Sequence, residues 1–428
     1  LGSNNQNTDL KSFPHPFRSG NYGEGSEPKT LIELQMMDYD SIRDQSMEMS
    51  VVDGVWQSDE LISQDIKQSL ISYVIILENV PENEQDWHPG TNKQILDLVH
   101  PSLFCFVNQI TRVINDKNHF INVDNALEHI DYTRSNVYQW IPTEFNISQD
   151  GKVKIESYIN NLHPIQHKNL YQIIENIFQC FIPLFNTVLT DLIYNQNIPN
   201  QIIVDPYQRY ADESSSDNQD DDDDNNHHRR TIIQPDVEEF QIPLSTNSNI
   251  NLCGRKLQII VKLANIILTP SNPKYPGDDH YGVNSVYGLQ DEQPLNQSLG
   301  KIITQENRCI VFPNIYQHCV APFQLKDSTQ PGQRKILVFF LVDPTIRILS
   351  TAHIPPQQSH WYIDLMRSTS PFNRLPSLVI NKIMSYIDFP MTMNQAKQHR
   401  DKLMDERKYF ISQNNHLLFE RPFSLCEH

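Results

Sequence analysis

Cysteine, glycine and long apolar runs are all scarce in this sequence, and each shortage excludes a class of protein. The six cysteines form no CxxC pair and no compact framework, which is typical of reduced thiols in a large core. An intracellular protein, cytoplasmic or nuclear, is therefore expected. The 13 glycines offer no phosphate-binding loop, and neither GxSxG nor HExxH occurs, so a hydrolase is disfavoured.

Neither a membrane nor a nucleic acid is an expected partner. The longest purely apolar run, Ile336 to Val342, is far shorter than the roughly 20 residues of a membrane span. Basic side chains are outnumbered, with 34 Lys and Arg against 52 Asp and Glu, and the formal net charge is −18. Such a charge opposes docking on a phosphate backbone or an anionic bilayer.

The chain is long enough for a large globular core with elaborations, since 38% of its 428 residues are hydrophobic. Between Asp212 and Arg230 it carries eight acidic residues and no apolar one, so this tract is expected to be disordered. The tract is either a solvated loop or an acidic arm that binds a protein partner or cations. We expect five ranges: a polar, partly disordered segment 1–49, an N-terminal α/β part of the core domain 50–205, an acidic disordered linker 206–240, a jelly-roll part 241–365 and a C-terminal helical appendage 366–428.

Apolar spacing predicts two helical regions and a hairpin in the first half. Apolar residues recur every three to four positions from Glu60 to Leu77, which indicates an amphipathic helix. Alternating residues on both sides of Asp150-Gly151 predict a β-hairpin with a tight turn. A helical stripe from Leu170 to Phe181 should end or kink at Pro183, before a second helix from Leu184 to about Tyr194.

The second half begins with strands and ends with helices. Leu257, Ile259, Val261 and Leu263 in RKLQIIVKLANIIL share one face of a strand, and RCIVF and KILVFFLV add two buried strands. Short strands with long connections favour an antiparallel sandwich or jelly roll. A stripe from Pro376 to Ile387 predicts one helix, and Thr392 with Gln395 forms the capping box of another that reaches about Ser412. This tail is expected to pack against the sheet.

Two residues near the end of the strand region are candidates for chemistry. His318 lies in FPNIYQHCVAPF between a strand and a proline corner, and Arg334 opens the strand KILVFFLV, so both can face one pocket. The pattern resembles the late half of prolyl-hydroxylase-like 2-oxoglutarate oxygenases, which implies that His318 binds Fe(II) and Arg334 holds the cosubstrate. The alternatives are a core histidine, a surface or interdomain ion pair for Arg334, and Lys335 as the inward residue if the register slips by one.

Two other histidines, His88 and His100, occur in DWHPGTNKQILDLVHPSLF. This segment mixes turn signals with apolar anchors. A lone histidine specifies little, so a packed or capping role is the favoured interpretation for both.

Much of the chain also resembles one uncharacterised eukaryotic family, domain of unknown function 4246. The resemblance lies in DWHPG with LDLVHPSLF, GKVKIESYINNLHP, GRKLQIIVKLANIILTP, FPNIYQHCVAPF with PGQRKILVFFLVDPTIRI and PPQQ, and FERPFSLCEH, in this order. It implies an α+β fold with a double-stranded β-helix (jelly-roll) core and N-terminal and C-terminal helical elaborations. It also implies an oxygenase-like histidine and arginine pattern.

The sequence departs from the family after Gly277. There the family pattern has a Trp-His-x-Glu motif that supplies the first histidine and the carboxylate, and about forty residues are absent here. Asp278-x-His280 has the right spacing in reverse order and is a weak substitute. If the deletion is real, little Fe(II) binding is expected because two ligands of three are gone, and reduced stability is expected because a lost strand pair exposes sheet edges and core.

Two functions from different classes remain. The first is an Fe(II)- and 2-oxoglutarate-dependent dioxygenase, with both cofactors bound if the chain is active and none if it is not. The second is a non-catalytic binding or scaffold protein that retains the oxygenase-like shell and binds partners through the acidic tract and the C-terminal helices. The stretch Leu375 to Ile387 resembles an F-box helix, although apolar core helices share its pattern.

Overall fold

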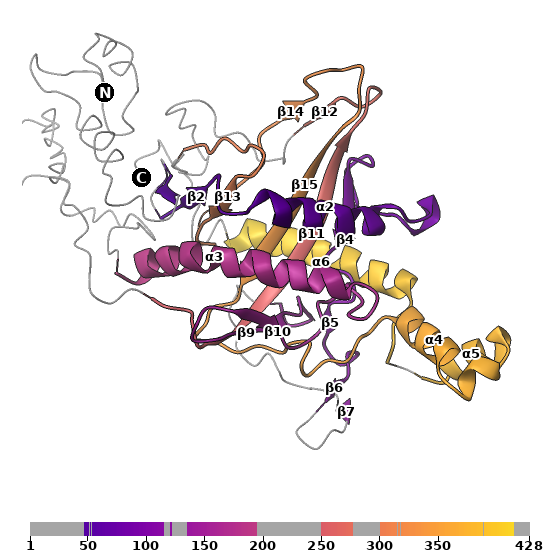
Figure 1. Cartoon of the computed structure of the whole chain (residues 1–428). Coiled ribbons are helices and arrows are strands. Elements are labelled where there is room, and N and C mark those ends of the chain that lie inside the picture. The colour runs from indigo at the N-terminus through magenta and orange to yellow at the C-terminus, as the bar shows by residue number, and fades with distance from the viewer. Residues whose placement is uncertain are drawn as a thin grey trace, which may run out of the picture.

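The structure is a computed structural model, and it describes residues 47–50, 52, 54–114, 120–121, 135–194, 250–276, 300–314, 316, 318–387 and 389–414. The acidic tract and the junction after Gly277 lie outside these residues. A central antiparallel sheet has helices α2 and α3 on one face and helix α6 on the other (Figure 1).

The central sheet is built around one long strand, β11, Lys256–Leu268. One edge of β11 pairs with β15, Gly332–Leu341. The other edge pairs with β9, Thr143–Ile147, near one end and with β4, Ile95–Val99, near the other. The sheet continues into β10, Val153–Ile155, and β3, Asp86–Trp87. The ranges 50–205 and 241–365 therefore contribute strands to one and the same sheet.

The main hydrophobic core lies between this sheet and two helices. Alternate residues of β11 face it, and Leu257, Ile259, Val261 and Leu263 are buried there as predicted. Opposite them lie α2, Gln64–Glu78, and α3, Lys168–Tyr194. Both the first helix and the hairpin are confirmed: Ser63 caps α2, and β9 pairs with β10 across a turn where Gly151 has φ +81°.

Pro183 does not divide the second helical region, so the prediction of two helices is wrong. α3 continues through Pro183 as one helix of 27 residues. The neighbours Ile182 and Leu184 are both buried in the main core, and their packing offsets the backbone hydrogen bond that proline removes. α3 alone among the described helices is long and apolar enough to cross a membrane by length and composition. Its apolar face lies in the main core.

Smaller sheets surround the central one. One joins β1, Glu48–Met49, with β2, Trp56–Ser58, and β13, Cys309–Val311. RCIVF is thus a strand as predicted, although of a separate sheet. The remaining pairs are two-stranded: β5 (Phe106–Val107) with β8 (Tyr138–Gln139), β6 (Val113–Ile114) with β7 (Phe120–Ile121), and β12 (Lys274–Tyr275) with β14 (Phe323–Gln324).

The C-terminal helices have different surroundings. The capping box is confirmed, since Thr392 N–H donates to Gln395 Oε1 at 2.9 Å at the start of α6, Met393–Asn414, which packs on the sheet as expected. α4, Ser359–Ser368, and α5, Ser377–Met384, lie beyond the sheet (Figure 1). The predicted stripe on α5 is largely exposed, because only Ile380 of that helix is buried. Two short 3-10 turns complete the described elements, Glu82–Glu84 and Phe372–Arg374.

The described residues confirm a mixed α and β fold with antiparallel sheets. The jelly-roll arrangement itself stays a prediction, as do the boundaries of the five ranges.

Candidate metal site on the α6 side of the sheet

Three side chains with metal-binding atoms meet on the face of the sheet that α6 covers. One nitrogen each of His88 and His100 and one carboxylate oxygen of Asp97 lie within 4.8 Å of one another. Among the described residues, this is the group of histidine, cysteine and acidic side chains that could hold a metal ion.

The β3–β4 hairpin positions all three groups. His88 follows β3 directly and its N–H donates to Ile95 O at 2.9 Å, which extends the ladder by one residue. Asp97 lies in the middle of β4, and His100 follows the last residue of that strand. Asp97 is paired with Ala264 of β11, so it points away from the core that Leu263 faces.

Asp97 is the most unusual member because it is a buried carboxylate. Its side chain is 1% exposed, and its Oδ2 accepts a hydrogen bond from His88 Nδ1 at 2.7 Å. Its Oδ1 has no hydrogen-bond partner in the part of the chain that the structure describes. A buried carboxylate oxygen without a partner is costly, so the site is short of one positively charged or hydrogen-donating group.

His100 is buried and electrically neutral. Its ring lies 5.1 Å from that of His88, and its Nδ1 accepts a hydrogen bond from Ser102 N–H at 3.2 Å. Burial, and after it the nearby positive charges of Lys262, His88 and Arg400, together lower the pKa of His100 to about 2. At neutral pH the ring therefore carries no charge, which is the state that binds metals.

Acid should destabilise the protein through His100. Below pH 6.5 the unfolded chain binds a proton at this histidine, whereas the folded protein does not until the pH approaches 2. Stability therefore falls as the pH decreases from 6.5, by up to about 1.4 kcal/mol per pH unit, or about 2 kcal/mol at pH 5. Urea unfolding of the wild type and of His100→Gln between pH 7 and pH 5 measures this loss.

The glutamine variant should lose less stability on acidification, since its amide oxygen can accept from Ser102 N–H and does not titrate. His318→Gln is the matched control, because His318 is exposed. Equal acid sensitivity of the wild type and His100→Gln would contradict the prediction.

The three donors fit a metal ion after their side chains move together. A metal at about 2.1 Å from each donor atom, with angles of about 90–109° between donors, needs donor separations of about 3.0–3.4 Å, so the widest gap must close by about 1.5 Å. The ion would take the place of the His88–Asp97 hydrogen bond. His100 must bind it either through Nδ1 or through Nε2 after its proton moves to Nδ1, and in both cases Nδ1 no longer accepts from Ser102 N–H.

Aromatic and basic side chains surround the three donors. Trp140 contacts His100 with ring centroids 6.4 Å apart. The guanidinium of Arg407 on α6 lies over the Trp140 ring, 4.3 Å from its centroid. On β3, the carboxylate of Asp86 binds Arg400 at 2.7 Å and Lys397 at 3.2 Å, both from α6. Helix α6 therefore covers the site with positively charged side chains.

The structure places the two predicted site residues outside this group. His318 is exposed, with its ring against Phe312 and its Nδ1 3.3 Å from Tyr316 O. Arg334 is half-buried on β15 and lies 5.8 Å from the centre of the Phe323 ring. Asp278 and His280, the substitute ligands considered for His318, lie outside the described residues. Metal binding by His318 thus stays a prediction.

Arg334 nevertheless shares a sheet face with Asp97. Arg334 is paired with Ile266, and Asp97 with Ala264, two residues away along the same strand. The strand spacing puts the two backbones roughly 12 Å apart. Lys335 points to the opposite face, where it binds Glu78 of α2, so Arg334 is the residue on the site's face.

The packed or capping interpretation of His88 and His100 was incomplete. His100 is indeed buried and accepts a local backbone N–H, but both histidines also meet Asp97. The available signal was Asp97 itself, a charged residue in the middle of the apolar strand ILDLV. A central strand rarely buries a carboxylate without a specific partner.

Comparison with known proteins gives a family and no closer relative. The family model described as Protein of unknown function (DUF4246) matches residues 30–284 and 277–364, more than half of the chain. The two matches overlap at residues 277–284, next to the junction after Gly277. No curated protein and no solved structure matches the chain significantly. The chain therefore belongs to the family of unknown function DUF4246.

Proposed function

We propose that this chain binds one divalent transition-metal ion at His88, Asp97 and His100 and uses it for oxygenase chemistry. The observation that carries the proposal is the gathering of two histidines and one carboxylate on one sheet face, with Asp97 Oδ1 buried and unpaired. Two histidines and one carboxylate are the donors of non-haem Fe(II) oxygenases, and they leave other positions on the metal for small ligands.

This donor set changes the expectation about Fe(II). Little binding was expected because the segment after Gly277 lacks the family's histidine and glutamate. His88, Asp97 and His100 come from a different part of the chain and need neither of them. Within this proposal, the antiparallel sheet is part of a double-stranded β-helix, Fe(II) is the metal and 2-oxoglutarate the cosubstrate.

Arg334 is the residue proposed to hold the cosubstrate. Its planar guanidinium can make paired hydrogen bonds with a carboxylate, and it lies on the same sheet face as Asp97. When bound, Fe(II) supplies the redox chemistry. The residues of the chain bind and orient: the two histidines and Asp97 hold the ion, and Arg334 holds the far carboxylate.

Metal titration and turnover test the proposal together. The wild-type chain should bind one Co²⁺, as a stable stand-in for Fe(II), by isothermal titration calorimetry and visible absorption. With Fe(II), O₂ and a reductant such as ascorbate, it should convert 2-oxoglutarate to succinate and CO₂. His88→Gln should lose both properties because glutamine is a poor ligand for these metals.

His318→Gln is the decisive companion variant. It removes the other candidate ligand and should bind Co²⁺ like the wild type, because His318 is not in the group of three donors. Loss of binding in His318→Gln with retention in His88→Gln would overturn the proposal in favour of the site predicted by resemblance. No binding by any of the proteins would overturn both.

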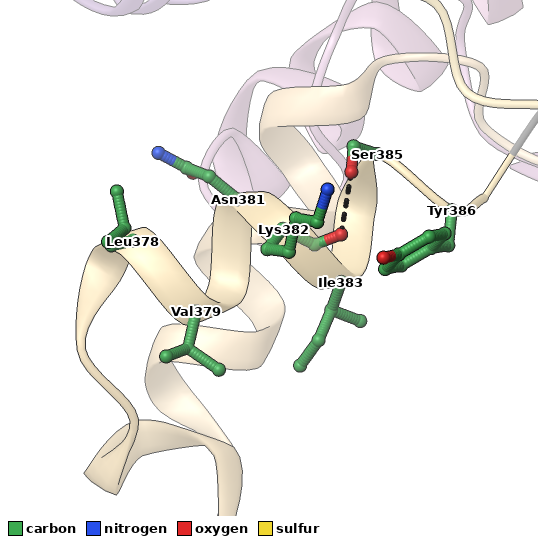
Figure 2. Close-up of a pocket in the computed structure, with 7 residues that line it drawn as sticks. All are labelled: Leu378, Val379, Asn381, Lys382, Ile383, Ser385 and Tyr386. Carbon is green, nitrogen blue, oxygen red and sulfur yellow. Dashed lines mark hydrogen bonds between the residues drawn. The ribbon is translucent and has the colours of Figure 1, made fainter.

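An exposed apolar surface favours a second candidate function, a non-catalytic binding protein. The α5 face, shown in Figure 2, consists of Leu378, Val379, Asn381, Lys382, Ile383, Ser385 and Tyr386. Leu378 on α5 is 82% exposed and Tyr386, two residues after the end of α5, is 77% exposed, which is unusual for two large apolar side chains on one surface. Between Asp364 and Asp388 the chain carries Arg367, which pairs with Asp364, and also Arg374 and Lys382, so the fitting partner is an acidic, partly apolar protein segment.

Site-specific cross-linking distinguishes this second function. A photo-reactive residue at position 378 should capture a protein with an acidic segment, and high salt should reduce the yield. The same residue at exposed position 165 is the control. Equal capture at both positions would leave the α5 face without a binding role.

A further inference from the structure

Helix α6 lies next to the proposed metal site because it binds strand β3, which His88 follows directly. Asp86 lies two residues before His88, so their side chains point to the same side of the β3 segment. The Asp86 carboxylate binds Arg400 and Lys397, one helical turn apart on α6. The Arg400 side chain is only 4% exposed, so this ion pair is inside the contact between helix and sheet.

The charges around the three donors are predominantly positive. Lys262, Arg400 and Arg407 all act on His100, and Lys397 joins Arg400 at Asp86. The acidic groups in these contacts are Asp86 and Asp97, with the exposed Asp401 at 3.7 Å from Arg400 Nε. A divalent cation placed among His88, Asp97 and His100 would add two positive charges beside the cations that α6 contributes. In a partly buried site such repulsion is weakly screened.

The contact between α6 and the sheet is also imperfect. Arg400 Nε and His399 Nδ1 are buried without a hydrogen-bond partner in the described part of the chain, and the Arg400 Nε lies 3.7 Å from Asp401. The apolar residues that α6 contributes to the core beneath it are Ala396 and Leu403. Unsatisfied buried groups cost free energy, so moving α6 away recovers part of what its packing contributes.

We propose that α6 is a metal-sensitive cover: its docking and metal binding at His88, Asp97 and His100 oppose each other. The proposal rests on the proposed function, since it requires that site to bind a metal. Coupling is reciprocal, so undocking α6 must raise metal affinity by the same factor by which metal weakens α6 docking, and removing positive charge from α6 should raise metal affinity as well. Displacing α6 would also uncover Trp140, which Arg407 now covers, beside the metal.

The test measures both directions of the coupling in the full chain. Arg400→Met removes the charge and keeps most of the side-chain volume, and it should bind Co²⁺ at least tenfold more tightly than the wild type. Lys402→Met is the matched control, because Lys402 is an exposed cation on the same helix, and its affinity should change less than twofold. In the wild type, Co²⁺ should speed hydrogen exchange of α6 amides while those of α2 stay protected.

The outcomes separate the two proposals. If Co²⁺ binds but Arg400→Met has wild-type affinity, or α6 exchange does not change, the cover is refuted and the metal site stands. If neither the wild type nor the variants bind Co²⁺, the metal site and the cover both fail. The exchange measurement decides the matter even if Arg400→Met does not fold, because it needs only the wild-type chain.

Discussion

Replacing Phe178 with alanine is expected to lower the free energy of unfolding by about 3–5 kcal/mol. Phe178 is fully buried on α3, and its ring contacts Phe145 of β9 and Phe339 of β15 at centroid distances of 5.0 and 5.2 Å. It therefore joins the long helix to both halves of the central sheet. The cavity left by alanine would be lined by side chains that the backbone holds in place, so it cannot collapse fully.

Urea unfolding followed by far-UV circular dichroism measures this effect. Phe372→Ala is the matched control, because Phe372 is 41% exposed beyond the sheet, and it should cost less than about 1 kcal/mol. Similar losses in the two variants would contradict the packing of α3 against the sheet.

Replacing Asp97 with asparagine is expected to weaken Co²⁺ binding on the order of 100-fold while leaving the protein folded. The amide has nearly the same shape but no negative charge, and the metal loses its only carboxylate donor among the three. The fold should survive because asparagine can still accept from His88 Nδ1, and a buried charge has been removed. The free energy of unfolding of the variant should differ from that of the wild type by less than about 1.5 kcal/mol.

Calorimetric titration with Co²⁺ and thermal unfolding of the same samples give both quantities. Asp364→Asn, an exposed carboxylate on α4, is the control and should change neither. An Asp97→Asn protein that binds Co²⁺ like the wild type would show that the ion, if any, is held elsewhere. One that does not fold would show that Asp97 is needed for structure instead.

These two residues differ in how visible they are in the sequence. Phe178 belongs to an apolar stripe with helical spacing, so its burial is predictable from the chain alone. The partners of Asp97 are not, because His88 reaches it across a hairpin turn and His100 across the end of a strand. The spacing of His88, Asp97 and His100 does not match the motif of a histidine and a carboxylate two residues apart on one strand.

Other outcomes follow the same division. The hairpin at Gly151, the capping box at Thr392 and the faces of β11 depend on neighbours in the chain, and all three are as predicted. The continuity of α3 through Pro183 and the exposure of the α5 stripe depend on what packs against each helix, and local patterns mispredicted both. Metal binding by His318 and cosubstrate binding by Arg334 remain predictions. The substitute ligands considered for His318 lie outside the described residues, and Arg334 lies on a different strand from the three donors.

By itself, the sequence determined the first helix, the hairpin at Gly151, the start of α6 and the apolar face of β11, because periodicity and turn chemistry act over a few residues. Membership of the family also follows from the order of its motifs. Only the tertiary structure decided that β11 joins strands from both ends of the chain and that His88, Asp97 and His100 meet beneath α6. Contacts between distant segments form wherever they bury the most apolar surface and satisfy the most charge, and neither quantity is defined until the whole chain has folded.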